Sequence, residues 1–122
     1  MTPTSMRVSR MPKLRHLRNR SFDLQHGLCY YCKQPMWVCD RGAFTRIYGV
    51  TDAQAALLQA TAEHLIARRD GGGDTHENVV ASCLFCNRRR HHARRRAPAP
   101  IEYLRRVRAR IAAGKWHGMR LV

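Results

Sequence analysis

Residues 61–92 read TAEHLIARRDGGGDTHENVVASCLFCNRRRHH, and the fold depends on this stretch. It opens with an acid–imidazole pair, Glu63 and His64, continues through three consecutive glycines, and ends with a Cys-x-x-Cys pair and a run of arginines. A second Cys-x-x-Cys lies upstream in GLCYYCKQPM. Two such pairs are the donor set of a closed tetrahedral zinc site. We therefore predict a structural Zn²⁺ held by Cys29, Cys32, Cys83 and Cys86.

The composition points to a polyanionic partner. The chain has 122 residues, a length that suits one domain. Its formal net charge is +15, and it contains only eight acidic residues. No apolar run approaches the roughly 18 residues of a membrane-spanning helix, so nucleic acid is favoured over a membrane. The two thiol pairs leave Cys39 as a spare thiol. This cysteine usage suits a reducing compartment, and we expect a cytoplasmic protein.

The chain divides into three expected parts. Residues 1–20 contain six basic residues and no acid, are interrupted by two prolines, and lack the apolar core of a secretory signal. We expect a basic N-terminal arm there, either solvated or adding phosphate contacts. Residues 21–97 would form the main domain. Residues 98–122 would form a basic amphipathic helix and tail packed on the same domain.

Local patterns predict the elements within these parts. Apolar periodicity, capping residues and glycine or proline breaks give, in chain order, helical turns at 21–27, an irregular segment with short-strand residues at 38–50, a helix from Thr51 or Asp52 to 58, a strand at 60–66, a polar glycine-rich loop at 68–77, a brief strand at 79–81, a helix between Cys86 and Pro98, and a final helix at 101–113. The final helix would bury Ile101, Leu104, Val107 and Ile111.

The segment EHLIARRDGGGDTHENVVASCLFCNRRRHH resembles the motif of HNH endonucleases, of the kind whose ββα core is braced by two Cys-x-x-Cys pairs. The resemblance covers Cys29 to about His92. It implies an α+β fold, with a small ββα-metal (HNH, or His-Me finger) core, a four-cysteine zinc site and flanking helices.

The resemblance also implies roles for individual residues. His64 would be the general base, Asn78 would order the loop, and Asn87 on the helix would bind a catalytic divalent ion. Glu63, in the position before the base, would be a second ligand of that ion. His91 lies four residues after Asn87 and shares its helix face, so it would be a further ligand or would contact phosphate or solvent instead.

These residue types suit phosphodiester hydrolysis, which needs a deprotonated water and charge relief at the phosphate. Carboxylate and amide ligands accept Mg²⁺ or Mn²⁺, and an added imidazole opens the site to Ni²⁺, Co²⁺ or Zn²⁺. Arginines in the loop and helix would bind nucleic acid; they are Arg68, Arg69, Arg88, Arg89, Arg90, Arg94 and Arg95.

The predicted function is therefore a metal-dependent HNH endonuclease that nicks or cuts DNA by hydrolysis. A non-catalytic, zinc-stapled nucleic-acid-binding module is the alternative from another class. An RNA-directed nuclease also stays open, because phosphate contacts carry little information about sugar or sequence. The partner would be DNA, with RNA as the other candidate, and the chain would act as a monomer or homodimer.

Overall fold

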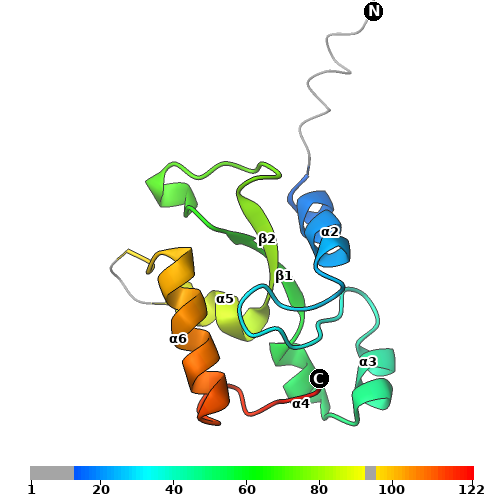
Figure 1. The fold of residues 1–122 in the computed structure, drawn as a ribbon. Helices are drawn as coiled ribbons and strands as arrows, with labels where there is room; N and C mark the ends of the chain where they lie inside the picture. Colours follow the sequence, from blue (N-terminus) through cyan, green and yellow to red (C-terminus); the bar gives the residue numbers. More distant parts are fainter. Residues whose placement is uncertain (1–12, 93–95) are drawn as a thin grey trace, which may run out of the picture.

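The computed structural model describes residues 13–92 and 96–122 (Figure 1). Two strands, five helices and one short 3₁₀ turn are present in these residues. In chain order they are α2 (Leu14–Leu24), α3 (Arg41–Tyr48), α4 (Asp52–Leu57), β1 (Ala60–His64), the 3₁₀ turn η1 (Arg68–Asp70), β2 (Val79–Cys83), α5 (Leu84–His91) and α6 (Pro100–Ala112). None of the helices in this described part is both long and apolar enough to span a lipid bilayer.

The centre of the fold is a β-hairpin followed directly by a helix. β1 and β2 pair antiparallel, with Ala60 opposite Cys83 and His64 opposite Val79. α5 starts at Leu84, immediately after β2, and packs against both strands. The predicted α+β fold with a ββα core is therefore confirmed. The helix begins before Cys86 rather than after it, because the Sγ of Cys83 accepts the backbone N–H of Cys86 and caps the first turn.

The first helix is longer than the sequence indicated. Residues 1–12 of the predicted basic arm lie outside the described residues, but α2 starts at Leu14 and Leu17 is buried. The hydroxyl of Ser21 donates to the carbonyl of Val79, and the Gln25 side chain exchanges hydrogen bonds with the backbone of Ala81. Residues 14–20 therefore belong to the folded body, where α2 covers the edge of β2, and are not part of an arm.

Residues 41–48 of the segment at 38–50 are helical, which corrects the expectation of irregular structure with short-strand residues. Asp40 caps α3 by accepting the backbone N–H of Ala43 at 2.9 Å. Gly49 ends the helix in the left-handed conformation, with φ of 66°. Phe44 is the buried residue of this short helix, so one inward side chain between two caps fixes the segment. The next helix, α4, has the predicted cap: Thr51 and Gln54 form a reciprocal capping box.

The last helix closes the core. α6 begins with Pro100 at its first turn and stops just before Gly114, as predicted. Its buried residues are Tyr103 and Val107, whereas Ile101 is 54% exposed, so the predicted apolar face is wrong at its first position. Tyr103 packs edge-on against Tyr31 with ring centroids 4.8 Å apart. The core therefore joins residues from the first thiol pair to the C-terminal Met119.

Candidate functional site

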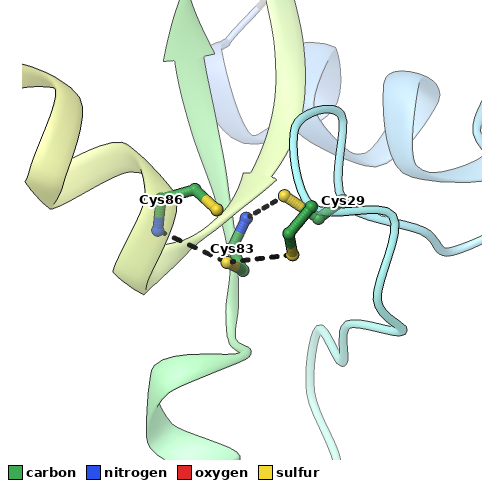
Figure 2. Close-up of side chains that lie close together, drawn as sticks. Cys29, Cys83 and Cys86 are labelled. Carbon is green, nitrogen blue, oxygen red and sulfur yellow. Dashed lines mark hydrogen bonds between the residues drawn. The ribbon is translucent and has the colours of Figure 1, made fainter. Parts of the chain in front are cut away.

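Four buried cysteines converge on one point. The Sγ atoms of Cys29, Cys32, Cys83 and Cys86 all lie within 4.8 Å of one another. Figure 2 shows three of them pointing together from the loop before α3, the end of β2 and the first turn of α5. The sulfurs of Cys32 and Cys83 are 3.9 Å apart. A tetrahedron with Zn–S bonds of about 2.3 Å has edges of about 3.8 Å, so the donor set fits a metal ion such as zinc.

The ionisation of the thiols also favours a cation. Burial raises the pKa of Cys86, while hydrogen bonds from the other thiols, Cys29 first, lower the pKa of Cys32. One thiolate is thus stabilised at the expense of its neighbours, and four buried thiolates require a divalent cation to be charged together. Two side chains from the C-terminal tail also reach the sulfurs. The indole N–H of Trp116 donates to Cys86, and His117 Nε2 lies 3.4 Å from Cys32 Sγ.

Tyr31, between the first two cysteines, links this cluster to the acid on β1. It is fully buried, and its hydroxyl donates to Glu63 Oε2 at 2.7 Å. Burial raises the pKa of Tyr31 well above its usual value, so the phenol stays a donor. A metal held by Cys29 and Cys32 would therefore also help to position the Glu63 carboxylate through Tyr31.

Glu63 is 1% exposed and both of its oxygens are engaged. Oε2 accepts from Tyr31 and from Arg90 Nη1, and Oε1 lies 2.8 Å from His91 Nε2. Burial alone would raise the pKa of Glu63, but the hydrogen bonds from His91, Tyr31 and Arg90 outweigh it and hold the pKa below its usual value. The carboxylate is therefore charged at neutral pH despite its burial.

Arg90 was predicted to contact nucleic acid, and the structure corrects this. Its side chain is 3% exposed, and all five of its N–H groups have acceptors. These are Glu63 Oε2 and the carbonyl oxygens of His64, Leu65 and Pro98, the last of which accepts twice. A guanidinium with no free donor cannot bind a phosphate. Arg90 instead joins α5, the end of β1 and the segment before α6.

The packing of α5 on β1 decides which helix residue meets Glu63. One helical turn of four residues rises about 6 Å, close to the advance of two residues along a strand. Asn87 therefore lies over Thr61, donating to its hydroxyl at 2.9 Å, and His91 lies over Glu63. The predicted grouping of Glu63 with Asn87 is not what the structure shows. His91 is the residue in contact with Glu63, and Asn87 is held one turn away.

The predicted base, His64, is oriented by a residue that the sequence interpretation missed. His64 Nε2 lies 2.8 Å from Asp74 Oδ1, and the His64 side chain is 13% exposed. Arg68 in turn donates to Asp74 Oδ2 at 3.1 Å, so this predicted nucleic-acid contact is engaged within the loop. The hydrogen bond from His64 lowers the pKa of Asp74. The available signal was the position of Asp74, just after the three glycines in a loop expected to fold back over β1.

Asn78 holds that loop closed. Its Oδ1 accepts the backbone N–H of Ile66 at 2.8 Å, and its Nδ2 donates to the carbonyls of Ile66 and Gly73, each at 3.0 Å. Gly72 lies against the same point, because a Cβ at this position would be 1.6 Å from the Ile66 oxygen. The hydrogen bonds of the Asn78 amide and the close approach of Gly72 to Ile66 therefore fix the loop with Asp74 beside His64. Any other residue at position 72 would force the backbone to move.

An open hollow of about 540 Å³ lies along α5 beside these groups. It is lined by Asn87, Arg88, Arg89, His91 and His92. Of the predicted nucleic-acid contacts, Arg68, Arg69, Arg88 and Arg89 are exposed, whereas Arg94 and Arg95 lie outside the described residues. The exposed Arg88 and Arg89 of α5 therefore line the same hollow as His91, which contacts Glu63.

Comparison with known proteins gives one match. Residues 50–93 match the family described as HNH endonuclease. Neither curated proteins nor solved structures gave a match. The matched segment contains β1, the glycine-rich loop, β2 and α5, which carry both side-chain pairs described above and two of the four cysteines. Residues 50–93 therefore form an HNH endonuclease-family domain, braced by a four-cysteine cluster that can bind a metal.

Proposed function

We propose that this protein is a metal-dependent endonuclease that hydrolyses DNA phosphodiester bonds, by nicking or double-strand cleavage, with His64 as the general base. The observation that carries the proposal is the 2.8 Å contact between His64 Nε2 and Asp74 Oδ1 at the end of β1. It supports the proposal because it orients an imidazole inside a domain of a nuclease family. His64 is sheltered but retains some exposure, so water can reach it.

The pairing with Asp74 defines which ring nitrogen can act. An ionised carboxylate only accepts hydrogen bonds, so His64 Nε2 carries the proton in this contact. The neutral ring then has its lone pair on Nδ1, which has no hydrogen-bond partner among the described residues. Nδ1 can take a proton from the water that attacks phosphorus. Such general-base assistance contributes about 10²- to 10⁴-fold to a rate.

Glu63 and His91 are the chain's candidate ligands for the catalytic ion. Their facing atoms are 2.8 Å apart, and two ligands at about 2.1 Å from one octahedral ion lie about 3 Å apart. A divalent ion at this position would supply charge neutralisation for the phosphate and the leaving oxygen. Because imidazole replaces the amide of Asn87 in this pair, we expect Mn²⁺, Ni²⁺ or Zn²⁺ to be favoured over Mg²⁺.

The exposed arginines of α5 supply the remaining contacts. Arg88 and Arg89 lie beside His91 in the same hollow, so they can neutralise phosphates next to the one that reacts. Contacts of this kind position the nucleic acid without reading its sequence. We therefore expect binding that is strong at low salt and weakly selective for sequence.

One observation favours the alternative of a non-catalytic binding module. Arg90 already places a positive charge 2.8 Å from Glu63, and both carboxylate oxygens have protein partners. A side chain satisfied in this way can serve packing alone. In that case the protein would bind nucleic acid through the same arginines and would hydrolyse nothing.

The test is cleavage of supercoiled plasmid by the purified protein with Mg²⁺, Mn²⁺, Ni²⁺ or Zn²⁺ in turn. His64→Ala is compared with His76→Ala, an exposed histidine in the same loop region. We expect His64→Ala to lower cleavage by at least about 10²-fold and His76→Ala to leave it unchanged. Single-stranded DNA and RNA of one sequence, offered in parallel, separate DNA from RNA cleavage.

The outcome can contradict the proposal in two ways. Equal cleavage by both histidine variants would exclude His64 as the base. Intact binding of DNA without cleavage in any of the four metals would support the binding module instead.

A further inference from the structure

A second basic hollow lies between α5 and α6, next to the one that contains His91. It measures about 290 Å³, and its charged walls are Arg89 and Arg90 from α5 and Arg106 and Arg110 from α6. The donors of Arg90 are all taken by acceptors within the protein, so the other three arginines are the ones available to a ligand. His92 and Arg89 line both hollows, so the two are adjacent. No acidic residue is among the described residues that line either one. Figure 1 shows α5 next to α6 and lying crosswise to it, and the hydroxyl of Tyr103 joins the two helices by donating to the carbonyl of Cys86.

We propose that this hollow is a second phosphate-binding track, in which Arg89, Arg106 and Arg110 hold the nucleic-acid backbone on one side of the phosphodiester that is cleaved. The proposal rests on the proposed function for the identity of the ligand. It adds α6 to the nucleic-acid interface, which otherwise consists of the loop and α5.

The guanidinium of Arg89 is fixed in a way that leaves its donors free. It lies over the ring of Phe85 at 4.6 Å and near that of Trp116 at 5.8 Å. Stacking uses the flat face of a guanidinium, so the N–H groups in its plane stay available for a phosphate. Among the described residues, the contacts of the Arg89 guanidinium are those with these two rings, with no hydrogen bond or ion pair beside them.

Arg106 and Arg110 present unpaired charge toward the same hollow. Both are exposed, and neither donates to an acceptor in the described part of the chain. They are four residues apart and so share one face of α6, separated by about 6 Å along its axis. The rise per nucleotide of a strand in duplex DNA is about 3.4 Å, so the two side chains can reach different phosphates.

The base of the hollow is tied to the cysteine cluster. Tyr103 is buried beneath it, and the half-buried Trp116 donates to Cys86 Sγ at 3.3 Å. A metal bound by the four cysteines would therefore also fix the distance between the arginines of α5 and those of α6. Three arginines with no acid beside them are suited to a polyanion, because no internal ion pair must be broken when it binds.

The experiment compares two double variants of the full chain that remove equal charge from one helix. Arg106→Gln/Arg110→Gln removes the α6 side of the track. Arg105→Gln/Arg108→Gln removes two other exposed arginines of α6, which do not line it. Binding of a fluorescent DNA duplex is measured by anisotropy from about 0.05 to 0.3 M salt, without divalent ions, so that cleavage does not interfere.

We expect the Arg106/Arg110 variant to lose about 1.8 from the slope of log K against log salt, at about 0.9 per phosphate contact. At 0.1 M salt this corresponds to a loss of affinity of roughly 10- to 60-fold. The Arg105/Arg108 variant should stay within about twofold of wild type. Equal effects of the two double variants would overturn the track, since net charge alone would then explain binding.

The result is separable from the test of catalysis. Unequal effects of the two variants on binding, with no cleavage in any metal, would support the track and contradict the proposed hydrolysis. Metal-dependent cleavage by the wild type, with equal effects of the two variants on binding, would support the proposed hydrolysis and contradict the track. Absence of any DNA binding by the wild type would contradict both.

Discussion

Gly72→Ala tests the geometry of the loop that orients His64. A Cβ at Gly72 would lie 1.6 Å from the carbonyl oxygen of Ile66 and 2.8 Å from Asn78 Nδ2. The oxygen belongs to the backbone, so no side-chain rotation relieves the overlap. At Gly73 the nearest atom to a new Cβ is a methyl of Thr75 at 3.8 Å, an ordinary contact. Neither glycine has a positive φ, so Gly73→Ala is a control that differs only in the available space.

The size of the effect follows from the hydrogen bonds that must break. Relieving the overlap moves Gly72 away from Ile66 by more than an ångström. This movement breaks the bonds from Asn78 Nδ2 to Ile66 and from the Gly72 amide to Ala67, and strains the one from Asn78 to Gly73. At about 0.5–1.5 kcal/mol each, the loss of stability is about 2–4 kcal/mol. A domain stable by about 5–15 kcal/mol stays folded, but with an altered loop.

The assay has two readouts. Urea unfolding followed by tryptophan fluorescence gives the free energy of unfolding, and plasmid cleavage reports the orientation of His64 by Asp74. We expect Gly72→Ala to lose about 2–4 kcal/mol and most of its cleavage, whereas Gly73→Ala should change stability by less than about 1 kcal/mol. If the two variants match in both readouts, the close approach of Gly72 to Ile66 does not exist in the protein in solution.

Three further outcomes are expected. Arg90→Met leaves the Glu63 carboxylate buried without its guanidinium partner, with only Tyr31 and His91 in contact with it. We expect a loss of about 3–5 kcal/mol in urea unfolding, with the exposed Arg88→Met as control, and a loss below about 1 kcal/mol would contradict the buried ion pair. The pKa of Glu63 is lowered by folding, so its contribution is present above about pH 4.5 and is lost as pH falls through the folded pKa. The stability difference between wild type and Glu63→Gln should therefore shrink between pH 6 and pH 3, and a constant difference would argue against a charged Glu63. Removal of bound metal with a strong chelator should unfold the domain, because structural zinc contributes about 10–16 kcal/mol, more than the whole free energy of unfolding of most domains. Circular dichroism measures the unfolding, and metal analysis should give one ion per four-cysteine cluster before chelation. Retention of the native spectrum after complete metal loss would show that packing alone holds the core.

The sequence alone determined the features that depend on spacing along the chain. The two Cys-x-x-Cys pairs predicted the four-cysteine cluster, because each pair already places two thiols on one side of a turn. The Thr51 cap, the strand at Ala60 and the stop before Gly114 were likewise readable, since caps and breaks act within a few residues. The helix within 38–50 was not predicted, because the signals that act within a few residues are too few there. The α3 helix has one buried side chain and too few residues for a periodicity to be visible.

Only the tertiary structure decided the partners of the charged and polar groups in the site. Arg90 stands in a run of three arginines and looks like its neighbours, yet the rotation of α5 on β1 buries it against Glu63 and leaves Arg88 exposed. The same packing brings His91 rather than Asn87 to Glu63, and the loop closed by Asn78 brings Asp74 to His64. These contacts join residues ten to twenty-eight positions apart. They depend on the relative placement of two strands, a loop and a helix, and packing rather than residue type or local spacing determines that placement.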